Sequence, residues 1–211
     1  MSYAPPLAAS LVAKWFIARA QQSPDHDLDN LKLQKLLYLA QSRYLHFSGK
    51  SLVKEEFSAW KHGPVIAPLY RECSEFGSEP IHMDLAEDGP WHQLTRDVEV
   101  VLDETWAAFG VYSGWRLRGI THDVGPWSEV FVEHVKNIVI PRDAIGDAWS
   151  EFSKFEAEPA VARNVIEDAL ERFRLLAIET PLGTRMGDPS LLENELARTE
   201  SLRKEANSLL P

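Results

Sequence analysis

The chain of 211 residues contains a single cysteine, Cys73, and no long uninterrupted run of apolar residues. A lone cysteine cannot form an internal disulfide bond, so the sequence fits a reducing compartment and we expect a cytoplasmic protein. No window approaches the roughly 18 consecutive apolar residues that a membrane-spanning helix needs. The first residues also lack the basic, apolar and small-residue pattern of a secretion signal, so we expect neither export nor membrane insertion.

Basic residues are scarce relative to acidic ones, with 22 Lys and Arg against 32 Asp and Glu, and the net charge is −10. Proteins that bind phosphate backbones use clustered lysines and arginines. The densest basic spots here, Lys32 with Lys35 and Arg116 with Arg118, are too sparse to form such a groove. We therefore do not expect direct nucleic-acid binding, whereas an acidic surface suits docking to a basic partner protein.

Patterns typical of metal binding or catalysis are missing as well. The seven histidines include no i, i+4 pair, and none joins Cys73 at zinc-finger spacing. Neither a G-x-S-x-G elbow nor a P-loop is present. Cys73 lies on the apolar stripe of an expected helix, where a buried, unreactive thiol is the commoner state. We predict no catalytic residue, no cofactor, no metal and no enzymatic activity, although a pair of carboxylates brought together by the fold stays open.

Apolar residues recur at helical spacing along most of the chain, which predicts a mainly α fold: a compact helical domain with one or two short β-strands. One helix is expected to begin at the capping residues 27–30 and to end at Gly49. Pro64 suits the first position of the next helix. Residues 57–60 and 138–140 are expected to form the short strands and to pair with each other.

Composition changes after about residue 155, because all seven tryptophans lie in residues 1–150. Two long amphipathic helices, after Pro159 and after Pro189, fit the remaining sequence. We predict two parts, a helical domain of residues 1–155 and a C-terminal two-helix extension of residues 156–211. The extension either packs on the domain or binds a partner through a leucine stripe that comprises Leu192, Leu196, Leu202 and Leu209.

Three segments of the sequence resemble the Panacea (SocA-like) antitoxin domain. They are, in chain order, residues 31–41 (LKLQKLLYLAQ), residues 59–70 (AWKHGPVIAPLY) and residues 114–127 (GWRLRGITHDVGPW). Their order and spacing agree with the family over about residues 8–155, and Gly119 departs from it because members more often carry a larger or polar residue there. The resemblance implies a compact helical domain with little strand, no catalytic residue or cofactor, and an antitoxin whose partner is a toxin encoded by an adjacent gene.

The residues of these segments also have plain structural interpretations. Lys32, Gln34 and Lys35 are expected on the solvent side of a leucine-rich helix, and His122 is expected to support a turn with a tryptophan packed behind it. Large aromatic and basic side chains concentrate binding energy at protein interfaces. If the segments contact a partner, the candidates are therefore Trp60, Lys61, His62 and Trp127.

The leading prediction is an antitoxin that neutralises a co-encoded toxin by direct protein–protein binding. Two alternatives stay open under the same resemblance: an adaptor that delivers the toxin to an ATP-dependent protease, and an enzyme that reverses the toxin's chemistry. A prophage-borne interaction protein unrelated to toxins is a further alternative. Pairing of the C-terminal helices would also produce a homodimer.

Overall fold

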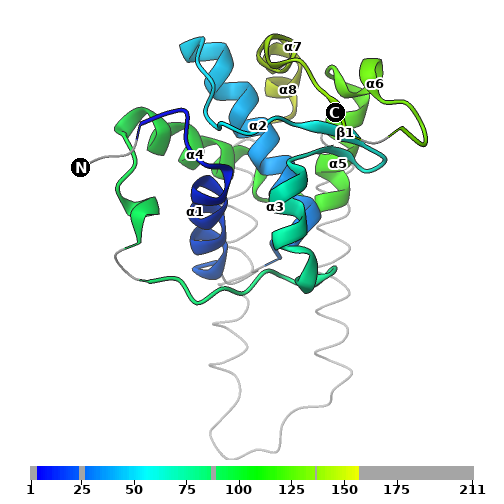
Figure 1. The fold of residues 1–211 in the computed structure, drawn as a ribbon. Coiled ribbons are helices and arrows are strands. Elements are labelled where there is room, and N and C mark those ends of the chain that lie inside the picture. The colour runs from blue at the N-terminus through cyan, green and yellow to red at the C-terminus, as the bar shows by residue number, and fades with distance from the viewer. Residues whose placement is uncertain (1–3, 24–26, 87–88, 136, 157–211) are drawn as a thin grey trace, which may run out of the picture. The chain divides into compact units, whose positions relative to one another are not determined.

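The computed structural model describes residues 4–23, 27–86, 89–135 and 137–156 (Figure 1). The fold is mainly α with one small sheet, as predicted. The helices are α1 (Ala9–Gln21), α2 (Asn30–Ser48), α3 (Ala67–Glu72), α4 (Arg96–Phe109), α5 (Gly114–Asp123), α6 (Trp127–Val130), α7 (Arg142–Asp147) and α8 (Trp149–Phe152). Apart from its first residue, the expected C-terminal extension lies outside the described residues, and so do Leu192, Leu196, Leu202 and Leu209.

α2 is the central helix of the domain, and capping residues set its two ends. The carboxylate of Asp29 accepts a hydrogen bond from the backbone N–H of Lys32 at 2.6 Å. Gly49 ends the helix in the left-handed conformation, with a φ of 65°. Both caps confirm the predicted bounds. α2 contacts α1, α4, α5, α7 and α8, which Figure 1 shows on different sides of it.

Because neighbours surround it, α2 is buried around most of its circumference. The expectation that Lys32, Gln34 and Lys35 face solvent is wrong, since their exposed fractions are 1%, 0% and 0%. A helix enclosed on all sides has no polar face, so the spacing of its apolar residues does not reveal which side chains are buried. The buried polar groups find partners inside the protein instead: Lys32 Nζ pairs with the carboxylate of Asp27, and Gln34 Oε1 accepts a hydrogen bond from the N–H of Ile66 at 2.9 Å.

The sheet has three short antiparallel strands in the order β2-β1-β3, where one or two strands are predicted. β1 (Ser58–Trp60) pairs with β3 (Ile138–Val139), as expected, and also with β2 (Gly63–Val65). The prediction that Pro64 starts a helix is wrong, because Pro64 lies within β2 and α3 begins only at Ala67. β2 lies at an edge of the sheet, where proline is tolerated because no neighbouring strand needs its missing N–H.

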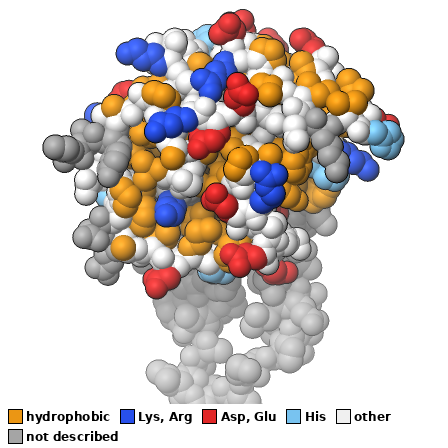
Figure 2. Space-filling model, in the orientation of Figure 1, with side chains coloured by type: hydrophobic (Ala, Val, Ile, Leu, Met, Phe, Trp, Pro, Cys, Tyr) orange, Lys and Arg blue, Asp and Glu red, His pale blue; other side chains and the backbone are white. Residues whose placement is uncertain are grey.

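The surface of the domain carries charges of both signs. On the face seen in Figure 2, acidic and basic side chains lie scattered among apolar ones, without a large area of one sign. Among the described residues, no helix is both long and apolar enough to cross a membrane. On this face, the charge that another molecule would meet therefore varies from place to place and does not follow from the net charge of −10.

Candidate functional site

The three segments that resemble the Panacea domain meet at one point of the fold. Lys35 belongs to the first segment, Gly63 to the second and His122 to the third. A Cβ atom placed on Gly63 would lie 2.8 Å from Lys35 Nζ and 3.2 Å from His122 Nε2. The elements that carry them, α2, β2 and α5, contact one another. Residues far apart in the sequence thus form one cluster beside the turn that joins β1 to β2.

Lys35 lies at the bottom of this cluster. Its Nζ donates a hydrogen bond to the backbone carbonyl of Pro64 at 2.7 Å, and its side chain is completely buried. Burial, and after it the positive charge of Arg118, lowers the pKa of the Lys35 amine well below its usual value. Lys35 therefore serves as a buried donor that fixes β2 on α2, and its amine is not offered to a partner.

Trp127 supports the cluster from the side of α6. Its ring stacks on His122, with centroids 3.5 Å apart, and on Phe131, with centroids 4.7 Å apart. Its Nε1 donates a hydrogen bond to the backbone carbonyl of Trp60 at 2.8 Å, and only 9% of the residue is exposed. The expected support of His122 by a tryptophan is confirmed. These contacts fix the end of β1, and with it the β1–β2 turn.

Above this support lies a group of aromatic and basic side chains, which we call the Trp115 surface: Lys61, His62, Trp115 and Arg118. The first three are exposed and Arg118 is half-buried. Trp115 has an exposed fraction of 63%, high for a tryptophan. The ring of His62 meets the ring of Trp115 edge to face, with centroids 5.6 Å apart. The guanidinium carbon of Arg118 lies 5.5 Å from the centre of the Trp115 ring, a cation–π arrangement.

The sequence-based candidates divide between the Trp115 surface and its support. Lys61 and His62 form the two-residue turn between Trp60 and Gly63, and both are exposed. Trp60 is half-buried, and its Nε1 donates a hydrogen bond to Asn137 Oδ1 at 3.3 Å. Trp60 and the nearly buried Trp127 thus have structural partners within the domain. That these four residues contact a partner protein stays a prediction.

Trp115 and Arg118 belong to the site although sequence reasoning did not select them. A signal for Trp115 was available in the spacing of its helix. The buried residues of α5, which are Gly114, Leu117, Ile120 and Thr121, define one face. Trp115 lies off that face, so a large aromatic residue points outward where a polar one is usual.

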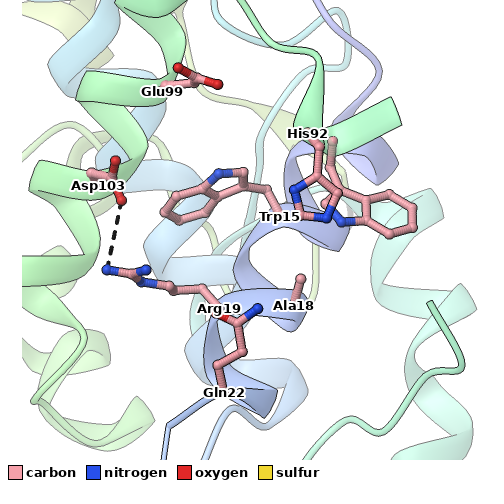
Figure 3. Close-up of a pocket in the computed structure, with 8 residues that line it drawn as sticks. Trp15, Ala18, Arg19, Gln22, His92, Glu99 and Asp103 are labelled. Atoms are coloured by element: carbon pink, nitrogen blue, oxygen red, sulfur yellow. Dashed lines mark ion pairs between the residues drawn. The ribbon is translucent and has the colours of Figure 1, made fainter. Parts of the chain in front are cut away.

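A shallow cavity of about 350 Å³ lies elsewhere, between α1, α4 and the turn Pro90–His92 (Figure 3). Its walls include Trp15, Trp91 and an ion pair between Arg19 and Asp103 with 3.9 Å between charged atoms. Binding cavities for small molecules are mostly apolar with few polar groups, whereas charged side chains line much of this one. It contains no residue of the three segments, and we place no site there.

The described residues show neither a metal-binding cluster nor a reactive cysteine nucleophile. Within them, no three His, Cys, Asp or Glu side chains gather as metal ligands would. Cys73 is completely buried, as expected. Burial, followed by the charges of Glu72 and Glu75, raises the pKa of its thiol to about 11, so the reactive thiolate is disfavoured at neutral pH.

His122 makes the stability of the domain depend on pH. Burial, and then the positive Arg118, Lys35 and His62, lowers its pKa from 6.5 to about 4. The unfolded chain takes up this proton near pH 6.5, whereas the folded chain excludes it until about pH 4. The contribution of neutral His122 to the free energy of unfolding is therefore complete above pH 6.5 and is lost as the pH falls toward 4.

We expect the His122→Phe variant, which keeps a flat ring on Trp127, to lose less stability than the parent chain between pH 7 and pH 5. The expected difference is on the order of 1 kcal/mol, because solvent screens a half-exposed imidazole. Urea unfolding of both proteins at the two pH values measures it. Parallel losses in the two proteins would contradict the prediction.

Comparison with known proteins assigns the domain to a family. Residues 33–128 match the family model of the antitoxin SocA-like, Panacea domain, so this part of the chain is a Panacea domain and the resemblance is confirmed. The matched range contains Lys35, the β1–β2 turn, Trp115 and Trp127.

One curated relative is named Antitoxin SocA, from Caulobacter vibrioides (strain NA1000 / CB15N). It is 32% identical over 115 residues, which cover 50% of this chain and 61% of the relative. The chain thus spans about three fifths of the length of that protein. No solved structure matches the chain at a significant level.

Proposed function

We propose that this chain is an antitoxin that neutralises a co-encoded toxin by binding it directly, without catalysing a reaction. The observation that carries the proposal is the Trp115 surface within a Panacea domain. Trp and Arg are the side chains in which binding energy concentrates at protein interfaces, and here an exposed Trp115 and a half-buried Arg118 lie on a firmly held support. The name of the relative, Antitoxin SocA, supports the same role.

The residues of this cluster favour direct binding of the toxin over an enzymatic activity. The two unusual nitrogen groups of the cluster, Lys35 Nζ and His122 Nε2, are buried beneath the surface. Neither lies where a substrate could reach it. The exposed groups above them are suited to hydrogen bonds, stacking and ion pairs with another protein.

The test is to express the adjacent reading frame alone and together with this chain in a host cell. We expect growth arrest in the first case and rescue in the second. The purified chain should bind the purified toxin and abolish its activity at a mole ratio of one to one. Loss of toxicity at a small fraction of that ratio would contradict the proposal and favour an enzyme.

The alternative binding mechanism is that of a proteolytic adaptor, which the resemblance to the Panacea domain allows equally. Its rescue depends on an ATP-dependent protease that removes the toxin. We expect rescue to persist in cells lacking each such protease, with the toxin still present by immunoblot. If rescue is lost in cells that lack one protease, the chain acts by delivering the toxin to that protease and not by neutralising it through binding alone.

The C-terminal segment is proposed as a second contact, because a stripe of leucines at helical spacing suits binding to another protein. Its candidate residues are Leu192, Leu196, Leu202 and Leu209. The full-length chain with Leu196→Asp and Leu202→Asp tests them in the same rescue assay. Unchanged neutralisation by that chain would restrict the contacts to the Panacea domain.

A further inference from the structure

The two long cations of the Trp115 surface have no acidic partner within the described part of the chain. Neither Lys61 nor Arg118 forms an ion pair there. By contrast, Arg43 pairs with both Glu104 and Glu156, the latter at 2.8 Å. Lys61 and Arg118 therefore remain available to pair with acidic groups of another molecule.

Positive charge also predominates around these groups. Burial, and then Arg118, Lys61 and Lys35, lowers the pKa of His62. Burial, and after it the positive charge of Arg118, also lowers the pKa of His122. Among the groups that shift these two histidines, Arg118 and Lys61 carry a positive charge at neutral pH, so the charges nearest to the Trp115 surface are opposite in sign to the net charge of −10.

Arg118 is held in a geometry that suits a carboxylate. Its guanidinium carbon lies 5.5 Å from the centre of the Trp115 ring, and the half-buried side chain forms no ion pair within the described residues. A planar guanidinium can donate two parallel hydrogen bonds to one carboxylate. Lys61, at the tip of the β1–β2 turn, adds a second cation that can reach a neighbouring acidic side chain.

We propose that the Trp115 surface binds an acidic segment of the toxin, with Arg118 and Lys61 on two of its carboxylates and Trp115 packed against the apolar part of that segment. The inference rests on the proposed function, and it names the chemistry by which the toxin is recognised. It differs from expectation based on net charge, which favours a basic partner, because local groups on this surface have the opposite sign.

A nucleic acid is a poorer fit than an acidic protein segment. Phosphate backbones are bound through many cations, and two free cations on a chain of net charge −10 would gain little against the overall repulsion. A protein segment needs only a few carboxylates beside an apolar residue. The exposed indole of Trp115 supplies the apolar contact.

The experiment compares two double charge reversals in the full-length chain. Lys61→Glu with Arg118→Glu changes the Trp115 surface. Lys50→Glu with Arg96→Glu changes the charge by the same amount at two exposed residues outside that surface. Affinity for the purified toxin is measured by calorimetry at 50 and 300 mM NaCl, and circular dichroism and thermal unfolding check that each variant folds.

We expect the first variant to bind at least about 100-fold more weakly than the parent chain at low salt, and the second to bind within about threefold. Higher salt should weaken the parent complex and have a smaller effect on the first variant. Trp115→Ala, a third variant, should lose at least tenfold in affinity without a change of charge.

Two results separate failure of this inference from failure of the proposed function. If the parent chain does not bind the toxin, the proposed function fails and the inference with it. If the parent binds and the first variant binds equally well, only the inference is overturned. It is overturned as well if the first variant loses self-association, or binding to a DNA or RNA fragment, while toxin binding is kept.

Discussion

Replacing Gly63 with alanine is expected to lower the free energy of unfolding by about 3 kcal/mol. Gly63 has a φ of 97°, a conformation that residues with a Cβ rarely adopt. The new methyl would also lie 2.8 Å from Lys35 Nζ and 2.9 Å from Lys35 Cε. Lys35 is completely buried and bonded to Pro64, so it has little room to move away.

Gly49→Ala is the matched control for this prediction. Gly49 also has a positive φ, 65°, but a Cβ there would meet no atom within 4 Å. Its loss should be limited to the backbone cost, about 1 kcal/mol. Urea unfolding of both variants measures the difference. Similar losses for Gly63→Ala and Gly49→Ala would show that the Lys35 contact is not a constraint.

The Gln41→Leu variant is expected to lose about 3 kcal/mol of stability although leucine has nearly the same size. Gln41 is 1% exposed, and its Oε1 accepts hydrogen bonds from the N–H groups of Leu52 and Val53, both at 3.0 Å. Its Nε2 donates to Ser51 Oγ at 2.9 Å. Leucine would leave two buried N–H groups without an acceptor, which costs more than the bonds themselves contribute.

Gln93→Leu provides the comparison, because Gln93 is exposed and the same exchange there should change stability by less than about 0.5 kcal/mol. Urea unfolding gives the free energies. Amide hydrogen exchange gives a second readout, since the N–H groups of Leu52 and Val53 should lose protection in Gln41→Leu. Full protection at these two amides, with unchanged stability, would contradict the prediction.

Local chemistry made much of the fold predictable. Asp29 and Gly49 set the ends of α2 through a side-chain cap and a left-handed residue, both of which depend on a few neighbouring residues. The pairing of β1 with β3 was also within reach, because each strand is a short apolar piece bounded by residues that break helices. Such features need no knowledge of the rest of the chain.

The features that depend on contacts between distant segments of the chain could not be predicted from the sequence. Periodicity places Lys35 on a wet face, yet α5, β2 and the rest of the domain cover that face. Pro64 has the chemistry of a helix start, but the hairpin pairing with β1 overrides it. Trp115 and Arg118 are i, i+3 neighbours on α5, so their contact is local, but His62 meets Trp115 only because α5 lies beside the β1–β2 turn, which no local spacing indicates.

The β1–β2 turn has only Lys61 and His62 between the paired residues Trp60 and Gly63. A loop of this length, closed by strand pairing and fixed below by Trp127, has few conformations to lose when another molecule docks. Ordering of flexible side chains and loops is one of the main entropic costs of association. The backbone of the β1–β2 turn is therefore preorganised for docking, and changes to Lys61 or His62 should alter affinity through side-chain contacts rather than through the ordering of a loop.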